Sequence, residues 1–355
     1  MRRPRENLPD SQPNFVDAPN SYNYESTPGF DTTMNNVHPT LTIITVTHNS
    51  GHLFWDMPDR VPVADWISTI FVDNDSQDGT PAVMAEAAPF ATVIKNDSNA
   101  GFSKAVNLGA RRVTSDFILL LDPDAYIGLD SLERLIFHTN AESTIAISAP
   151  LVTDSHGIFD TVAAGLAPTV WRMFTSVCGL TRFGGFFPPI QGHYLLRRDF
   201  RHGIDQVDVD WVSGGCMLIK TSAWRELGGL TERWFLHAAD IDFCLRAQQL
   251  GYRIMVDSST HAIHEFGQST DGEDGRTNPA WVVNLYELYR LRLTRSQFQS
   301  RCWKLVVVAG LLSRAGALKA LTIFPRHRKK YAAECHSFMG FALALWKQSS
   351  EIPSE

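Results

Sequence analysis

The sequence lacks the short motifs that define several common enzyme classes. It contains no GxGxxG, so nicotinamide binding of the usual kind is unsupported. It contains no GxxxxGK followed by Ser or Thr, which argues against a P-loop NTPase. No GxSxG is present to indicate a serine hydrolase, and there are no internal repeats. These absences exclude the nucleotide and hydrolase sites that are easiest to recognise.

Cysteine is scarce as well. The chain has five cysteines, an odd number, and no two are spaced as CxxC. This pattern argues against a disulfide framework or a zinc knuckle and favours a reducing compartment. The first ten residues, MRRPRENLPD, carry charge but no apolar stretch, so we expect no secretory signal peptide. The expected location is therefore the cytoplasm.

Acidic residues are missing from one long stretch. The net charge of −6 argues against a generic nucleic-acid binder, yet between Glu287 and Glu334 there is no acidic residue and there are eleven basic ones. Residues 303–324 are mostly apolar, but Arg314 and Lys319 interrupt them, which argues against a membrane span. We expect an amphipathic helix in peripheral contact with anionic membrane. The alternative is a helix packed on the catalytic domain with a solvated basic face.

The whole chain is predicted to have three parts. Its 355 residues, 44% of them hydrophobic, support a substantial core. Residues 1–38 are rich in Pro, Asn, Ser and Asp and are expected to form a disordered tail. Residues 39–275 are predicted to form an α/β domain, and residues 276–355 a C-terminal helical region with the basic stretch.

Apolar runs alternate with helical patterns through the α/β part. Runs typical of buried strands cover residues 41–47, 66–72, 93–94, 117–121, 145–150, 216–219 and 254–256. Helical patterns cover residues 81–88, 104–112, 129–138 and 240–250. This alternation predicts βαβ units and a mostly parallel sheet flanked by helices. Residues 151–203 are expected to be irregular, as binding loops often are.

Polar residues follow three of the predicted strands. Asp122 and Asp124 come directly after a run of three leucines, and residues 48–49 and 73–74 follow two other strands. The carboxyl ends of parallel strands lie on one edge of a sheet, where ligands bind. A carboxylate pair there suits Mg²⁺ or Mn²⁺ shared with substrate phosphates. The alternative is ordinary turn chemistry, because Asp-Pro-Asp is common in turns.

Seven segments, in this order, resemble family 2 glycosyltransferases. They are THNS at 47–50, VDNDSQDGT at 72–80, NAGFSKAVN at 99–107, LDPD at 121–124, WVSGGC at 211–216, FLHAADID at 235–242 and AIH at 262–264. The resemblance covers about residues 40–270 and is nearest to bacterial rhamnosyltransferase-like enzymes of cell-envelope glycan assembly. It implies a GT-A fold, in which a Rossmann-like nucleotide-binding half and an acceptor half share one continuous sheet.

The resemblance also implies a reaction. A sugar, rhamnose among the candidates, would pass with inversion from a nucleotide-diphosphate donor to a hydroxyl of a glycan or lipid-linked acceptor in cell-envelope polysaccharide synthesis. Such a transfer needs Mn²⁺ or Mg²⁺ at the leaving diphosphate and a base for the hydroxyl proton. The resemblance favours dTDP-rhamnose over UDP-linked sugars. The alternative is a non-catalytic nucleotide-sugar or glycan-binding protein on the same fold.

Site residues follow from the matching positions. The metal ligands implied are Asp124, Asp122 and His264, although His264 could be an ordinary polar histidine beside the sheet. The residues implied in nucleotide or donor binding are Thr47, His48, Asn49, Asp73, Asn74, Gly101, Lys104, Asn107, Asp122, Trp211 and Gly214.

Several of these donor residues have an equally simple structural interpretation. Asp73 and Asn74 would contact the base edge, or they would form an Asx turn. Lys104 would reach the diphosphate, or it would be a solvated helix lysine. Trp211 beside paired glycines would line the sugar pocket, or it would be a core tryptophan.

Asp240 is the expected general base. As the N-cap of a helix its carboxylate would be held in the charged form, and the alternative is a plain capping residue. Asp242 is four residues before Arg246 and is expected to form an i,i+4 ion pair. The family usually has an acid immediately before the base, whereas this chain has Ala239. That departure is the one feature that favours the binding-protein alternative.

Overall fold

The computed structural model describes residues 38–53, 61–160, 162–184, 187–196, 200, 205–265, 278–324 and 327–350. Tertiary contacts divide the chain into two units, Met1–His38 and Pro39–Glu355. Apart from His38, the predicted disordered tail lies outside the described residues. The C-terminal helices belong to the second unit, and the predicted division into three parts stays a prediction.

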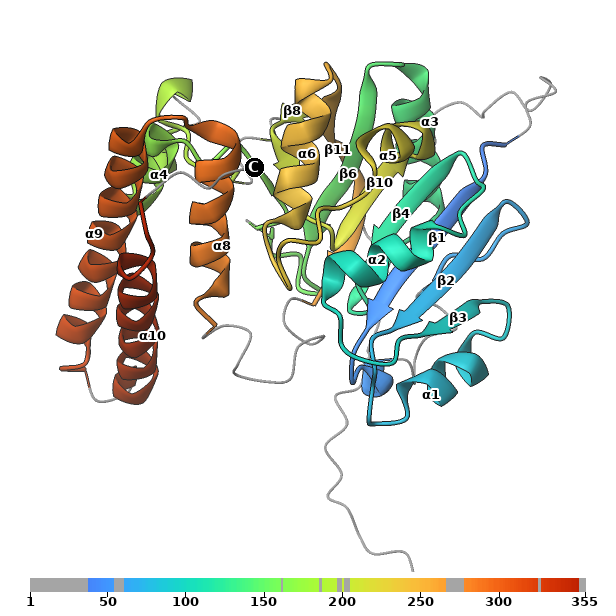
Figure 1. Cartoon of the computed structure of the whole chain (residues 1–355), viewed down its shortest axis with the longest axis horizontal. Coiled ribbons are helices and arrows are strands. Elements are labelled where there is room, and N and C mark those ends of the chain that lie inside the picture. Colours follow the sequence, from blue (N-terminus) through green and yellow to red (C-terminus); the bar gives the residue numbers. More distant parts are fainter. Residues whose placement is uncertain are drawn as a thin grey trace, which may run out of the picture. The chain divides into compact units, whose positions relative to one another are not determined.

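The N-terminal half of the sheet is parallel, as predicted. Its strands, in the order in which they pair, are β3 (Thr92–Lys95), β2 (Ile67–Asp73), β1 (Leu41–Thr47) and β4 (Phe117–Leu121). The helices between them are α1 (Thr80–Ala87) and α2 (Phe102–Ala110). Because β1, β2 and β4 are parallel neighbours, their carboxyl ends meet at one edge (Figure 1).

The second half of the sheet mixes directions. β10 (Cys216–Lys220) runs antiparallel to both β4 and β6 (Ile145–Thr153), and β11 (Arg253–His264) runs parallel to β6. β5 (Ala125–Ile127) and β8 (Gln206–Val209) pair antiparallel with β11. The described residues therefore form one continuous nine-stranded mixed sheet, which confirms the predicted sharing of a sheet between two halves.

Two hydrophobic cores cover the two faces of this sheet. Alternate residues of β4 enter opposite cores, because side chains alternate across a strand. One core includes residues of α2, α5 (Thr221–Leu227) and α6 (Ala239–Gln249). The other includes residues of α1 and α3 (Leu129–Ala141). Burial on both faces explains why these strands read as continuous apolar runs.

The segment predicted to be irregular contains more regular structure than expected. β7 (Ala164–Gly165) pairs with β9 (Trp211–Val212), and α4 (Val170–Val177) begins after Thr169, whose side chain accepts from the Arg172 amide. The 3₁₀ helices η3 (Leu180–Phe183) and η4 (Pro188–Ile190) lie in the same segment. Another 3₁₀ helix, η1 (Gly51–Leu53), follows β1. The residues of α4 are mostly β-branched or aromatic and form helices weakly by themselves. Tertiary packing stabilises this helix, so sequence pattern did not reveal it.

The C-terminal region is helical and packs against the α/β part. Its elements are α8 (Ala280–Leu288), a π-helical turn η6 (Tyr289–Leu293), α9 (Gln297–Leu321) and α10 (Arg328–Trp346). Trp303 of α9 is fully buried and stacks on Tyr286 and Tyr289. A Cβ on Gly310 would lie 2.2 Å from Cβ of Val177, so α9 meets α4 at backbone distance.

The inner face of α9 therefore packs on the α/β part, as the alternative prediction of a helix packed on the catalytic domain had it. It does not have the surroundings of a single helix lying in the plane of a membrane. Among the described helices, none has both the length and the apolar content that crossing a bilayer requires.

Candidate functional site

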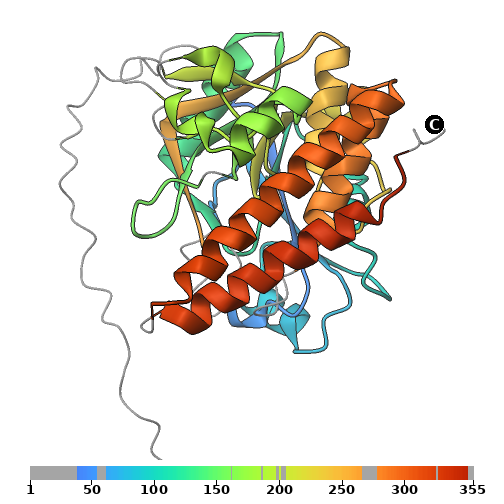
Figure 2. The same cartoon turned by 90° about the vertical axis from the view of Figure 1, so that its left-hand side faces the viewer.

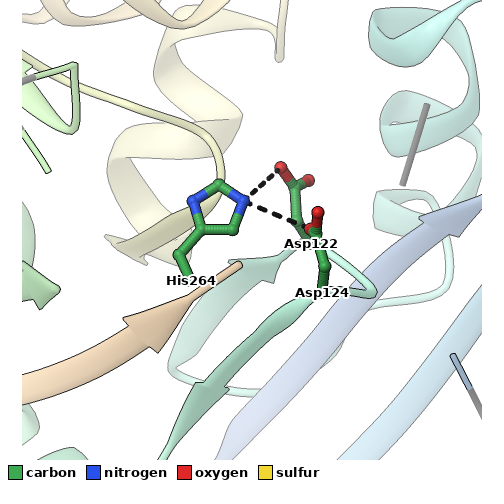
Figure 3. Close-up of side chains that lie close together, drawn as sticks. All are labelled: Asp122, Asp124 and His264. Atoms are coloured by element: carbon green, nitrogen blue, oxygen red, sulfur yellow. Dashed lines mark hydrogen bonds and ion pairs between the residues drawn. The ribbon is translucent and has the colours of Figure 1, made fainter. Parts of the chain in front are cut away.

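Two carboxylates and an imidazole lie together at the carboxyl end of β4 (Figure 3). Asp122 and Asp124 follow β4, and His264 is the last residue of β11. Nε2 of His264 is 3.2 Å from Oδ1 of Asp124 and 3.8 Å from Oδ2 of Asp122. His264 pairs with Ala125 across the β11–β5 ladder, and this pairing fixes the imidazole beside the Asp-Pro-Asp turn.

The electrostatics of this cluster suit a divalent cation. Burial alone would lower the pKa of His264, but the hydrogen bond with Asp124 and the nearby carboxylates raise it to about 9. The pKa of Asp122 rises to about 6, first through burial and then through the charges of Asp124 and Asp240. The site thus concentrates negative charge that a cation would neutralise. Two carboxylates and one imidazole are also a donor set that proteins use for metals.

Two further residues shape the cluster. Oδ2 of Asp160 is 3.8 Å from Nδ1 of His264, on the opposite side of the ring from Asp124, and Oδ1 accepts from the Val162 amide. A Cβ on Gly215 would lie only 3.0 Å from Cε1 of His264, so a side chain at this position would press on the imidazole. Sequence reasoning missed Asp160, because it lies in the segment predicted to be irregular and belongs to no motif.

Asp240 lies in the first turn of α6, but it is not the N-cap. The cap is Ala238, so the predicted capping role of Asp240 was wrong. Oδ2 of Asp240 accepts from the Gly214 amide at 3.2 Å. His237 and Ala238 have φ of 65° and 70°, a left-handed conformation that is uncommon for residues with a Cβ. Such local strain is often found at functional sites.

The environment of Asp240 differs from the one expected at a helix cap. Burial raises the pKa of its carboxyl, although the amides of Gly214 and Ile241 act in the opposite direction. The expectation that capping holds the carboxylate in its charged form was therefore wrong, because the effect of burial on the pKa exceeds that of the amides. A raised pKa brings a carboxylate closer to neutral pH, where a general base works best. The charge of Asp240 also raises the pKa of Asp122, which ties the two sites together.

Gly101 and Asn107 hold the loop that precedes α6. Gly101 has φ of 85°, and a Cβ there would lie 2.6 Å from the carbonyl oxygen of Phe235. The Asn107 side chain donates to the Leu230 carbonyl and accepts from the Leu230 amide. Both residues are thus engaged within the chain, and their predicted donor contacts stay predictions.

The ends of β1 and β2 are linked by hydrogen bonds. The Thr47 hydroxyl donates to Asp73, whose other oxygen accepts from the Ser76 amide. The Asn74 side chain donates to Oδ1 of Asn99. Only the Ser76–Asp73 bond is a contact within the turn, and the other two join separate segments of the chain. The predicted base-edge contacts stay predictions.

The neighbouring residues join the same two strand ends. Nδ1 of His48 is 2.9 Å from the Asn74 carbonyl, which can only accept, so Nδ1 donates. Asn49, with φ of 52°, accepts from the Gln77 amide. Lys104 is exposed in the first turn of α2. The structure therefore brings residues 48–49 beside residues 74–77, as the strand-end pattern predicted.

Trp211 lies in a buried aromatic group. Its side chain is 3% exposed, its Nε1 donates to the Leu166 carbonyl, and its ring centroid is 5.0 Å from that of His193. This burial fits the core interpretation of Trp211. Its predicted place in the sugar pocket stays a prediction. Gly214, three residues later, donates its amide to Asp240.

His193 gives a prediction for acid stability. Burial lowers its pKa to about 4 from an ordinary value of 6.5. A depressed folded-state pKa means that the unfolded chain binds the proton first, so stability is complete above pH 6.5 and falls as the pH drops towards 4. For this group alone we expect a loss of about 2 kcal/mol in the free energy of unfolding between pH 7.5 and pH 5. Urea unfolding of wild type and His193→Gln at both pH values tests this. An equal acid loss in both proteins would assign the effect to other groups.

Asp242 has a structural role. It is buried and accepts from Nε of Arg246 at 2.9 Å, which confirms the predicted i,i+4 ion pair. It also accepts from Nε of Arg292 at 2.6 Å, which ties η6 to α6. Leaving two arginines without this partner would cost about 3–5 kcal/mol of stability.

Comparison with known proteins defines the class. Residues 42–203 match the family model described as Glycosyl transferase family 2. This part of the chain is similar to glycosyl transferase family 2, and the protein is a glycosyltransferase. The match ends before Asp240 and His264, so those residues are supported by geometry and motif only.

Individual relatives agree with the family. The chain is 24% identical over 217 residues to the N-acetylglucosaminyl-diphospho-decaprenol L-rhamnosyltransferase of Mycobacterium tuberculosis, covering 58% of this chain and 68% of that protein. It is 26% identical over 176 residues to a low-salt glycan biosynthesis hexosyltransferase of Haloferax volcanii, covering 48% and 50%. A mannosyltransferase from Pyrobaculum calidifontis, solved with GDP-Man and Mn²⁺, shares the fold with a TM-score of 0.54, 16% identity and 88% coverage of each chain.

Proposed function

We propose that this glycosyltransferase is an inverting, metal-dependent enzyme, with the cation at Asp122, Asp124 and His264 and with Asp240 as general base. The observation that carries the proposal is that two adjacent glycines join the acidic cluster to Asp240: the Gly214 amide donates to Asp240, and the Asp122 amide donates to the Gly215 carbonyl. The charge of Asp240 also raises the pKa of Asp122, which supports a role for both residues in the same reaction.

The residues would divide the work as follows. Asp122, Asp124 and His264 would hold Mn²⁺ or Mg²⁺, which when bound neutralises charge on the departing diphosphate. The Asp240 carboxylate, oriented by the Gly214 amide, would accept the proton of the acceptor hydroxyl. Direct attack by that hydroxyl on the donor sugar inverts its anomeric centre.

A rhamnosyl donor is the more specific part of the proposal. The mycobacterial relative is named as an L-rhamnosyltransferase acting on a diphospho-decaprenol compound, which supports dTDP-rhamnose over UDP-sugars and a lipid-linked glycan as acceptor. Such an acceptor places the reaction at a membrane, so we propose that the chain works peripherally at the cytoplasmic face. The alternative of a non-catalytic binding protein is not favoured, because Asp124 and Asp240 are both present and the relatives are transferases.

A thermal-shift panel tests the donor class. We expect one nucleotide among dTDP, UDP and GDP to raise the melting temperature, and only with Mn²⁺ or Mg²⁺. Ligand at about 100 times its dissociation constant adds roughly 2.7 kcal/mol, which is several degrees for a domain of this size. The Asp124→Asn variant should lose the metal-dependent part of the shift. A shift that needs no metal, or no shift with any nucleotide, would contradict the proposal.

A further inference from the structure

The hairpin formed by α9 and α10 has an apolar outer face. Figure 2 shows the two helices side by side, and Nζ of Lys304 on α9 donates to the Gln348 carbonyl just after α10, so the helices run antiparallel. Six large apolar side chains on the two helices are between 50% and 74% exposed: Phe298, Leu305, Leu312, Met339, Leu343 and Trp346.

The spacing of these side chains puts them in stripes. The three on α9 are seven residues apart, and those on α10 are four and three apart, so each set lies along one side of its helix. The opposite side of α9 carries Trp303, Val307 and Leu311, which are buried. The hairpin is therefore apolar both towards the protein and away from it. We call the six exposed residues the outer stripe.

The charge around the outer stripe has one sign. Residues 297–347, which include both helices, contain nine lysines and arginines and a single acidic residue, Glu334. At the turn between the helices, Arg328, Lys329 and Lys330 are exposed beside Ile323 and Phe324, whose side chains are 76% and 54% exposed. Exposed apolar residues of this size, framed by basic ones, indicate an interaction surface.

We propose that the outer stripe docks the protein onto an anionic lipid bilayer, with the basic residues at the level of the headgroups. Apolar burial and attraction to anionic lipid act together in such surfaces, and long basic side chains reach the interface while their stems lie along apolar groups. A second copy of the chain fits less well, because self-association would bring two basic faces together. The surface consists of two helices already held by the protein, so docking does not require a helix to fold at the membrane.

Vesicle sedimentation with the full chain tests the proposal. We expect binding to vesicles of phosphatidylcholine with phosphatidylglycerol and much weaker binding to phosphatidylcholine alone. The triple variant Leu305→Gln, Leu312→Gln, Leu343→Gln should bind anionic vesicles at least about tenfold less. A second variant, Lys329→Ser with Lys330→Ser, should bind anionic vesicles about fivefold less for each charge removed. Its remaining binding should depend less on salt concentration than that of wild type.

The matched control is Phe90→Gln with Phe137→Gln, two phenylalanines 53% and 55% exposed elsewhere on the chain. It should bind as wild type does. Circular dichroism and melting curves confirm that each variant is folded. Light scattering without lipid measures the oligomeric state. Wild-type sedimentation that matches the triple variant, or a lipid-free dimer that the triple variant dissociates, would overturn the proposal. No donor or acceptor is present in these assays, so their outcome is independent of the proposed reaction.

Discussion

Replacing Asp240 by asparagine is expected to lower kcat by about 10²–10⁴-fold, the usual contribution of a general base. The amide keeps the size of the side chain but cannot accept the acceptor proton. Because burial raises the pKa of the carboxyl, the protein gains no stability from its charged form, so the variant should lose only one hydrogen bond, from the Gly214 or the Ile241 amide, and should melt close to wild type. Steady-state transfer assays and melting curves measure the two effects separately.

A control for this experiment is Asp130→Asn, which changes an acid in the first turn of α3, the position that Asp240 occupies in α6. It should leave kcat unchanged. Nucleotide-induced thermal shifts should remain in Asp240→Asn, because the donor site is intact. A kcat for Asp240→Asn within a few-fold of wild type would remove Asp240 from the mechanism.

Replacing Asp124 by asparagine is expected to lower turnover by about 10²–10³-fold and to weaken Mn²⁺ binding. Asp124 is 3% exposed and, of the carboxylates within 4 Å of His264, is the one nearest to it, so its loss removes the best-placed oxygen ligand. Added Mn²⁺ at high concentration should restore part of the activity, which would not happen if the variant were simply misfolded.

The combination with His264→Gln sharpens this test. If both residues hold the same ion, the double variant should be hardly worse than either single variant, because the ion is already lost. Transfer rates for the four proteins measure this coupling. Losses that multiply would mean that Asp124 and His264 act separately.

Much of the fold could be predicted because its strands are buried on both faces. β1 and β4 read as continuous apolar runs, and the helical pattern over residues 240–250 corresponds to α6, which ends just before Gly251, with φ of 87°. Helix α4 and strand β8 were missed because their residues have weak intrinsic preferences and are held by partners distant in the sequence. Local pattern does not contain that information.

The residues of the candidate site likewise divide into those that the sequence revealed and those that it did not. The Asp122–Asp124 pair was visible because it follows a buried strand directly, and His264 was visible because a short motif contains it. Asp160 was invisible, since no motif marks the turn, closed by the bridge between Thr153 and Phe159, that brings the chain back towards His264. The capping role of Asp240 failed because two left-handed residues, His237 and Ala238, start the helix earlier than side-chain chemistry suggests.

The central claim is that the strand-end cluster holds a divalent cation together with the donor diphosphate. An EPR titration of Mn²⁺ with wild-type protein, with and without the nucleoside diphosphate chosen by the thermal-shift panel, tests it most directly. The account predicts that the nucleotide tightens Mn²⁺ binding and that Mn²⁺ tightens nucleotide binding by the same factor, as linkage requires. Mn²⁺ binding that is indifferent to the nucleotide, or that survives unchanged in Asp124→Asn, would contradict it.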